Sequence, residues 1–327
     1  MIRLLALCLA FFASSAFAQY PSKPTRLISP FPPGGSVDLV GRLLAAKLSE
    51  AMGQQMVVEN RSGASGVIGT ELVMNAPADG YTWLANAAKD LGTYPVAGLV
   101  DTRITDWTVY LHIANASVIS VGNNSPYKTI QDVVAAMKAK PGQVSVGTAG
   151  INSSGHTSIE AFTKALGLTY KHVSYDGGNP AVIATVAGEV EITPQLAVEQ
   201  AQMIRGKRLR PLAVLSDKPL ELAGYGSIPP ITASIKEFKP DLNYFGMYLA
   251  KGTPDNIVKT VNKIWDDVIM KSEALKKYAT DNGSVFDPHH GESAQKVAMP
   301  AIQSAAWLLH AGGTAKVSPD SVGIPKP

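Results

Sequence analysis

The 327-residue chain contains one cysteine, Cys8, which excludes an internal disulfide and a cysteine-rich metal site. Charged residues make up only 17% and aromatic residues 7%, against 46% hydrophobic residues. Disordered chains show the opposite balance, so this chain is expected to fold around a core. The formal net charge is only +3. Proteins dedicated to nucleic acids gather many lysines and arginines against phosphates, so no nucleic-acid partner is expected.

The N-terminus has the pattern of a secretory signal peptide. Arg3 precedes an apolar run from Leu4 to Phe17, and Ala16-Phe17-Ala18 is a small-x-small cleavage box, so residues 1–18 are expected to be removed after Ala18. A lipoprotein site at Cys8 is the alternative, but the preceding residue is a leucine where a small residue is wanted. No other stretch reaches the length of a membrane span. The mature protein is therefore expected to be soluble and, in a bacterium with two membranes, periplasmic.

Short strand-like runs alternate with amphipathic helical stretches, which indicates an α/β fold, and the length suggests two lobes. Glycine and proline turns separate the elements, and Ser36, Thr129 and Thr253 are expected to cap helices. The helix after Thr253 should bury Val261, Ile264, Trp265, Val268 and Ile269. Strands are expected at Arg26–Ile28, Met56–Glu59, Thr82–Ala85, Val144–Gly147, Lys171–Ser174, Pro211–Leu215 and Phe245–Ala250, with the last returning to the first lobe.

The usual signatures of catalysis are missing. The sequence has no HExxH, GxSxG or GxxxxGK[ST] motif. Serines lie among glycines at Gly150–Gly155 with His156 beside them, but this spacing does not match the strand-turn-helix elbow of a serine hydrolase. We therefore expect no enzyme activity, and an exported hydrolase is a distant alternative.

Three other clusters are open to a functional and a plain structural interpretation. His289 and His290 could bind a metal, but adjacent histidines point apart, and a solvated loop is favoured. The spacing of Gly63, Gly66 and Gly69 is not GxGxxG, so no dinucleotide cofactor is expected. The basic run Arg205–Arg210 is interpreted as solvated surface, with a partner contact as the minority interpretation. No metal and no cofactor is expected.

Two loops of small residues remain. Gly34-Gly35-Ser36 leads into the first expected helix, and Asn152-Ser153-Ser154-Gly155 leads into a later one. Free backbone N–H groups and the helix dipole favour anions at such helix starts. Two of them facing each other across lobes would hold both ends of a dicarboxylate, while ordinary helix capping is the alternative interpretation.

Blocks of sequence along nearly the whole mature chain resemble the tripartite tricarboxylate transporter receptor family, the Bug or TctC-type periplasmic binding proteins. They occur in family order and are jointly specific. The blocks are YPSKPTRLI (20–28), PFPPGGSVD (30–38), GRLLAAKLS (41–49), VVENRSGASGVIGT (57–70), APADGYTW (76–83), KPGQ (140–143), SYDGGNPA (174–181) and KGTPDNIV (251–258).

The resemblance implies a two-lobed α/β flytrap that closes on a small carboxylate and delivers it to a membrane permease. Lobe 1 is expected to comprise residues 19–122 and 245–327, and lobe 2 residues 123–244. We expect a monomer whose ligand is a dicarboxylate, with aromatic diacids such as terephthalate included. A sensor protein presenting the ligand to a membrane receptor kinase is the alternative function. Ligand contacts are expected at Pro33, Gly34, Gly35, Asp38, Asn86, Thr148, Ala149, Asn152, Ser153, Ser154, His156, Tyr175, Asp176 and Gly177.

Two stretches depart from the family pattern. Residues Lys89 to Arg103 lack the usual sequence after the third expected strand, and Ser227 to Ile235 match only loosely. The family includes receptors for citrate, amino acids, nicotinate and aromatic acids. The resemblance therefore does not name the ligand.

Overall fold

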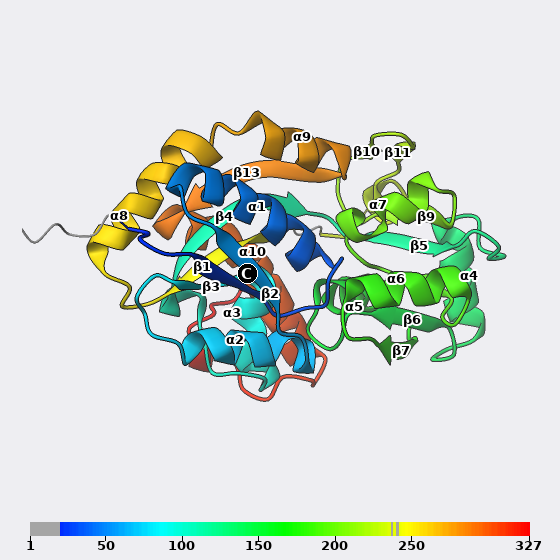
Figure 1. Cartoon of the computed structure of the whole chain (residues 1–327). Helices are drawn as coiled ribbons and strands as arrows, with labels where there is room; N and C mark the ends of the chain where they lie inside the picture. Colours follow the sequence, from blue (N-terminus) through cyan, green and yellow to red (C-terminus); the bar gives the residue numbers. More distant parts are fainter. Residues whose placement is uncertain (1–19, 237, 240–241) are drawn as a thin grey trace, which may run out of the picture.

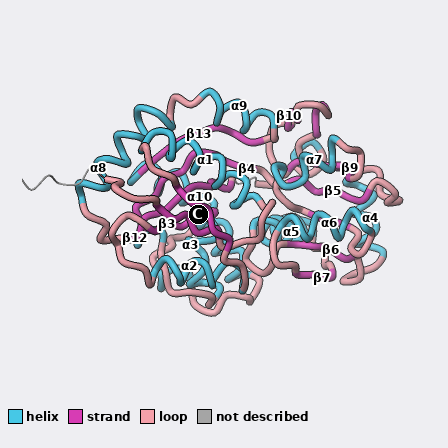
Figure 2. The backbone as a smooth tube through the Cα atoms, in the orientation of Figure 1, coloured by secondary structure: helices cyan, strands magenta, loops and turns pink. Residues whose placement is uncertain are grey.

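A computed structural model describes residues 20–236, 238–239 and 242–327. The chain forms two lobes, each built on one β-sheet with helices packed around it (Figures 1 and 2). The expected signal peptide, its cleavage site and Cys8 lie outside the described residues. None of the helices in the described part of the chain has the length and apolar character needed to cross a membrane.

Lobe 1 contains a six-stranded sheet in the order β13-β4-β12-β3-β1-β2. β1 pairs in parallel with β2 and β3, whereas β12, β4 and β13 add antiparallel pairs. The strands are β1 (Thr25–Ser29), β2 (Met56–Asn60), β3 (Thr82–Ala87), β4 (Trp107–Asn115), β12 (Asn243–Ala250) and β13 (Ser284–His290). The covering helices are α1 (Ser36–Met52), α2 (Val67–Met74), α3 (Ala88–Ala97), α8 (Asp255–Ile264), α9 (Glu273–Asp281) and α10 (Gly291–Ala311).

Lobe 2 contains a five-stranded sheet in the order β7-β6-β8-β5-β9. Its strands are β5 (Val118–Gly122), β6 (Ser145–Thr148), β7 (Lys171–Ser174), β8 (Ile192–Thr193) and β9 (Leu209–Val214). Its helices are α4 (Ile130–Ala139), α5 (Ser154–Leu166), α6 (Gly178–Ala187) and α7 (Ala197–Arg205). A small hairpin, β10 (Leu220–Leu222) with β11 (Gly226–Ile228), lies beside α9 of lobe 1 (Figure 1).

The chain crosses between the lobes at two places. The first crossing is Ala116-Ser117, between β4 and β5, and the second precedes Asn243 at the start of β12. The expected boundaries after residue 122 and before residue 245 therefore lie differently in the structure. β5 belongs to the sheet of lobe 2, because its backbone pairs with β8 and β9.

Two local expectations about the C-terminal third were wrong. Val268 is 37% exposed instead of buried, because a π-helical turn over Trp265–Ile269 changes the helical phase after α8. His289 and His290 were expected in a loop but end β13, where they pair with Leu111 and Tyr110 of β4. This pairing joins segments far apart in sequence, so local composition could not predict it.

The core of lobe 1 extends into lobe 2. Leu196 and Val198, at the start of α7, are 2% and 4% exposed and belong to the same hydrophobic cluster as Phe245 and Tyr110 of lobe 1. The lobes are therefore in direct apolar contact, and the structure represents a closed arrangement.

Candidate binding cleft between the lobes

A cavity of about 20 Å³ lies in the seam between the lobes. This volume is room for about one water molecule. The first turns of α1 from lobe 1 and of α5, α6 and α7 from lobe 2 all reach it. Its lining residues are Phe31, Ser36, Val37, Asp90, Ala149, Ser153, Ser154, Gly178, Gln195, Leu196, Glu199 and Phe245. Parallel strands place the helix starts that follow them at the same sheet edge, which explains this convergence.

The start of α1 is occupied by a carboxylate from the other lobe. Oε1 of Glu199 accepts a hydrogen bond of 3.0 Å from the backbone N–H of Ser36, and Oε2 accepts one of 3.3 Å from the N–H of Leu196. Ser36 was expected to cap α1 with its own side chain, but the N-cap residue is Gly35, which has no side chain to do so. A carboxylate of lobe 2 thus occupies the start of α1, where the sequence analysis places a ligand carboxylate.

Two glycines make room for polar side chains at this place. A Cβ atom on Gly178, the first residue of α6, would overlap the carboxylate of Glu199. A Cβ atom on Gly155, in the first turn of α5, would lie 2.5 Å from the amide oxygen of Gln195. Glu199 and Gln195 thus reach the helix starts of lobe 2 at close range because no side chain stands between them.

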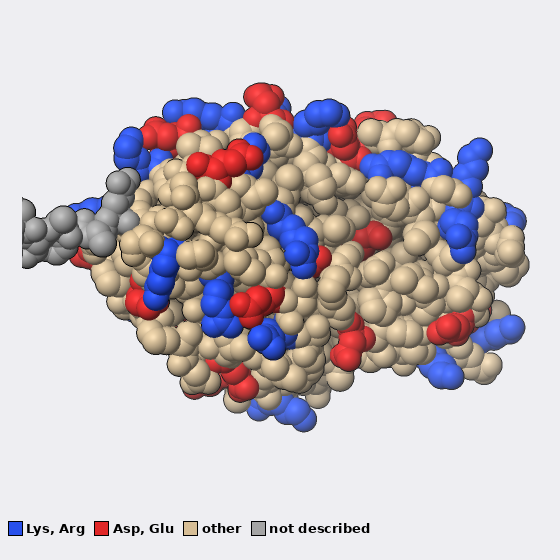
Figure 3. All heavy atoms as spheres, in the orientation of Figure 1, with Lys and Arg blue, Asp and Glu red and all other residues tan. Residues whose placement is uncertain are grey.

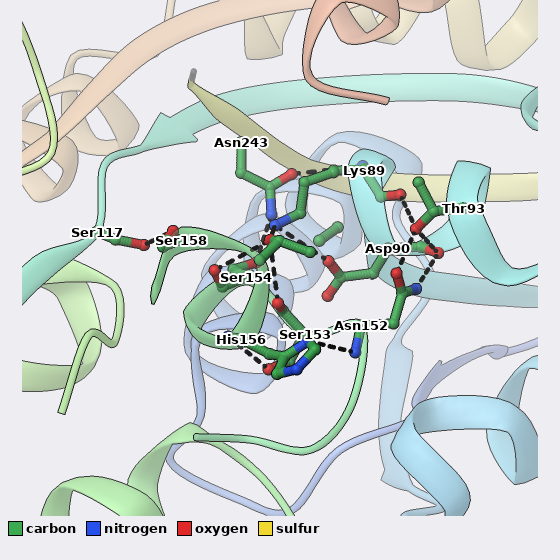
Figure 4. A network of polar contacts seen from close by, with 12 residues as sticks. Lys89, Asp90, Thr93, Ser117, Asn152, Ser153, Ser154, His156, Ser158 and Asn243 are labelled. Carbon is green, nitrogen blue, oxygen red and sulfur yellow. Dashed lines mark hydrogen bonds and ion pairs between the residues drawn. The ribbon is translucent and has the colours of Figure 1, made fainter. Parts of the chain in front are cut away.

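A polar network beside the cavity joins α3 of lobe 1 to α5 of lobe 2 (Figure 4). The ammonium group of Lys89 donates to the hydroxyl of Thr157 and lies 3.8 Å from Oδ1 of Asp90. The side-chain amide of Asn243 donates to the hydroxyl of Ser154. The contacts of Lys89 with Thr157 and of Asn243 with Ser154 connect the two lobes, and the side chains of Lys89, Asp90 and Asn243 are removed from solvent.

The acids of the cleft have altered proton affinities. Burial raises the pKa of Asp90 to about 6; the nearby Lys89 lowers this value, while the negative charge of Glu199 raises it. Burial also raises the pKa of Glu199, although the N–H groups of Ser36 and Leu196 partly stabilise its anion. Two acids in one closed cleft repel each other, so their charge is a central property of the site.

The start of α5 is built as the sequence predicted. Ser153 is the N-cap, and its hydroxyl accepts a 3.3 Å hydrogen bond from the N–H of His156. Nδ1 of His156 accepts from the N–H of Asn152, which adopts a left-handed conformation with φ 68°. The side chain of Asn152 contacts lobe 1, because its Oδ1 accepts from the hydroxyl of Thr93 at 2.9 Å. Burial, followed by the charges of His172 and Lys89, lowers the pKa of His156 to about 4, so this ring is neutral.

Of the first predicted loop, Ser36 lines the cavity, whereas Gly34 and Gly35 lie next to it. The carboxylate of Asp38 accepts from the N–H of Gly34 at 3.0 Å, from Arg42 at 2.9 Å and from Asn60 at 2.8 Å. Burial would raise the pKa of Asp38, but these hydrogen bonds outweigh it and lower the pKa. Asp38 therefore braces the loop. Pro33 is exposed, and Gly35 is buried at the helix start.

The remaining predicted residues divide into those at the cavity and those behind it. Ala149, Ser153 and Ser154 line it. Asn86 is buried and donates to the hydroxyl of Tyr94, and the hydroxyl of Thr148 lies 2.7 Å from the ring of His172. Tyr175 is half-buried and Asp176 is exposed. Gly177 packs beside Pro32 across the seam.

Sequence reasoning missed Lys89, Asp90, Gln195 and Glu199. Lys89 and Asp90 open α3 directly after β3, and the other two follow β8, so all four lie at the carboxyl ends of strands. Ligands of α/β proteins bind at such ends, and charged residues there were the available signal. The expected strands did not include β8, and the stretch after Ala85 had no assigned element, so this signal could not be applied.

The other sequence clusters do not reach the cleft. His289 lies 3.1 Å from Asp287, and His290 lies 3.0 Å from Asp266. Arg205 donates to the carbonyls of Ala223 and Asp281. Arg210 donates to the carbonyls of Asn123 and Tyr127 at 2.6 and 3.0 Å. The interpretation of Arg205–Arg210 as merely solvated surface was therefore wrong for these two arginines, which hold loops in place.

Lysine and arginine side chains are scattered over the face seen in Figure 3, and acidic side chains also occur along the seam between the lobes. This distribution offers no continuous basic surface on that face. A search of the described residues finds no cluster of three or more metal-ligating side chains.

The sequence and the fold are similar to those of several known proteins, periplasmic binding proteins among them. The family model "Tripartite tricarboxylate transporter family receptor" matches residues 40–308. A Pseudomonas sp. (strain P51) protein, the "UPF0065 protein in tcbD-tcbE intergenic region", is 36% identical over 79% of each chain. The periplasmic binding protein BugD shares the fold with a TM-score of 0.82 and 24% identity, over 90% of this chain and 99% of that one.

A structure from R. palustris, solved with adipate, has a TM-score of 0.78 and 26% identity, over 94% of this chain and 100% of the other. The likeness extends over both lobes and the seam between them. The fold is thus the two-lobed α/β architecture of periplasmic binding proteins, as the sequence predicted. With the family model covering most of its length, the chain belongs to the tripartite tricarboxylate transporter receptor family.

Proposed function

We propose that this protein captures a small organic acid in the cleft between its lobes and delivers it to the membrane permease of a tripartite tricarboxylate-type transporter. The observation that carries the proposal is the convergence of the α1, α5, α6 and α7 starts on one interlobe cavity. Helix starts present N–H donors and positive dipole ends, which suit carboxylates. The protein acts in the periplasm, by binding and release and without catalysis of its own.

The expectation of a dicarboxylate, aromatic diacids included, remains a prediction. The adipate seen in the R. palustris relative supports a diacid of that size as a starting ligand. The alternative function, presentation of the ligand to a membrane receptor kinase, would use the same cleft and closure. Deletion of the chromosomal permease genes separates the two functions, because it should abolish uptake but leave a sensory response intact.

A screen of the purified protein against aliphatic and aromatic carboxylates tests the proposal. Thermal shift identifies candidates, and calorimetry then measures the affinity and stoichiometry. We expect one acid bound per chain and recovered unchanged after release. Failure of every acid to bind, or conversion of a bound acid into a product, contradicts the proposed function.

Ligand exchange is predicted to require separation of the lobes, since the closed cavity has room for only about one water molecule. A disulfide between Gly34 of lobe 1 and Asn179 of lobe 2, each replaced by cysteine, would hold the lobes closed. A Cβ atom on Gly34 would lie 4.0 Å from Cβ of Asn179. That spacing suits a disulfide. With the expected signal peptide removed, the chain has no other cysteine.

The double variant Gly34→Cys/Asn179→Cys should bind the best acid of the screen at least about tenfold more slowly when oxidised, and recover on reduction. Stopped-flow fluorescence measures the rate, and each single variant is the control. Equal rates in the oxidised and reduced double variant, with the disulfide shown by mass spectrometry, would rule out the closing movement.

A further inference from the structure

The start of each helix that should receive a ligand carboxylate lies beside a carboxylate of the protein. At α1, Glu199 already accepts the N–H of Ser36 at 3.0 Å. At α5, the hydroxyl of Ser154 stabilises the anion of Asp90 by a hydrogen bond. A ligand with two carboxylates would have to displace these acids or share their sites with them.

The charge of the cavity lining also disfavours a ligand with two carboxylates. Asp90 and Glu199 are its only ionisable residues, and both are acids. Lys89, which is outside the lining, lies 3.8 Å from Asp90 and also contacts Thr157. The lining itself thus carries two acids, and a ligand dianion would add two further negative charges in a region of low dielectric.

Unpartnered buried atoms define what a ligand must supply. Oδ1 of Asp90 is an acceptor, and Nε2 of Gln195 is a donor. Neither has a hydrogen-bond partner within the described ranges, although the two residues are 5% and 1% exposed and line the same cavity. A buried polar atom without a hydrogen bond is unfavourable, and the 3.8 Å ion pair of Oδ1 with Lys89 is too long to supply one, so both atoms call for a complementary group. A carboxylate could accept from Gln195, but it has no hydrogen to donate to Asp90.

We propose that the ligand carries an ammonium group in addition to its carboxylate, and that Glu199 and Asp90 select it by binding the ammonium group. The ligand carboxylate then accepts from the amide of Gln195 and the start of α5. Glu199 is the specificity-determining residue, because it closes the α1 position to a second carboxylate. This inference rests on the proposed function and specifies its substrate class as amino acids whose amino group meets the acids of the cleft.

Two matched sets of probes test it by calorimetry on the purified protein. The first set is adipate, the ω-amino acid of the same length and hexanoate; the second is terephthalate, its aminomethyl analogue and the methyl analogue. In at least one set, the amino acid should bind at least about tenfold more tightly than the diacid, because a hydrogen bond to a charged group has about this effect.

The variant Glu199→Gln keeps the shape and an acceptor for the N–H of Ser36 but removes the charge. It should lower the preference for the amino acid over the diacid by about tenfold or more. Glu221→Gln, at the exposed position of strand β10, makes the same change of charge away from the cleft and should leave the preference unchanged. Asp90→Asn is a second variant with the same expected direction, in case Glu199→Gln does not fold.

The outcomes separate the two proposals. Tighter binding of a diacid, with the same preference in Glu199→Gln, overturns the ammonium inference and leaves the proposed function standing. Hexylamine is added as a probe that has the ammonium group but no carboxylate. If it binds as tightly as the amino acid, recognition of the ammonium group is supported but the proposed capture of an acid is contradicted. If no probe of either set binds but another acid of the carboxylate screen does, the ammonium inference fails and the proposed function stands.

Discussion

Replacing Lys89 by methionine is expected to lower the free energy of unfolding by about 3 kcal/mol, because breaking a buried ion pair leaves one charge uncompensated. Asp90 would then lose its cation while the negative charge of Glu199 remains nearby, and the hydroxyl of Thr157 would lose its ammonium partner. The methionine preserves most of the apolar volume, so the loss reports on the charge rather than on a cavity. Urea unfolding at neutral pH measures it.

The double variant Lys89→Met/Asp90→Asn should recover at least half of the loss, since it removes the stranded acid together with its cation. Lys251→Met is the matched control, because Lys251 is exposed in the turn after β12. A loss below about 0.5 kcal/mol for Lys89→Met, which is typical of exposed ion pairs, would show that the network of Figure 4 does not stabilise the closed lobes.

Acid is expected to destabilise the protein between about pH 6.5 and pH 4, through two buried histidines. Burial lowers the pKa of His112 to about 3 and that of His156 to about 4. The unfolded chain binds protons at these rings from pH 6.5 downward and the folded chain does not. The contribution of the two neutral rings to the free energy of unfolding is therefore fully present above pH 6.5. Each histidine then removes about 1.4 kcal/mol for each pH unit through this window.

Asp90 acts in the opposite direction. Its folded pKa of about 6 lies above the ordinary value, so between pH 6 and pH 4 the folded protein binds a proton that the unfolded chain does not. The stability gained through Asp90 offsets the loss caused by about one of the two histidines, so the free energy of unfolding falls by a net amount of about 3 kcal/mol by pH 4. Urea unfolding at a series of pH values should give a shallower slope for His156→Gln than for His310→Gln, which replaces an exposed histidine. Equal slopes would show that His156 is not held neutral.

Local signals predicted many elements correctly. The turn of prolines and glycines after β1, the N-cap Thr129 with its hydroxyl accepting from Asp132, and the N-cap Ser153 each act within a few residues of their own position. Such short-range contacts can therefore be predicted from the sequence pattern alone. The two loops at helix starts were found in this way, although neither loop supplies most of the cavity lining.

The part that could not be predicted depends on the approach of the lobes. Glu199 is ordinary as the third residue of a helix, where an acid usually reaches back to its own N-cap, as it does here to Leu196. Its second partner, Ser36, lies in the other lobe. In the same way, the ammonium group of Lys89 finds its partner Thr157 in the other lobe. No local pattern reports such a contact.

The placement of β12 has a consequence for the order in which the lobes can fold. Lobe 2 is one continuous insertion, so all its strands are available once the chain has emerged past β9. Lobe 1 must wait, because β12 lies between β3 and β4 in the middle of its sheet and comes late in the sequence. A chain that emerges from its N-terminus can therefore complete lobe 2 first. The N-terminal strands of lobe 1 remain an unfinished sheet until Asn243–Ala250 arrives, and this interval is when they most need protection from aggregation.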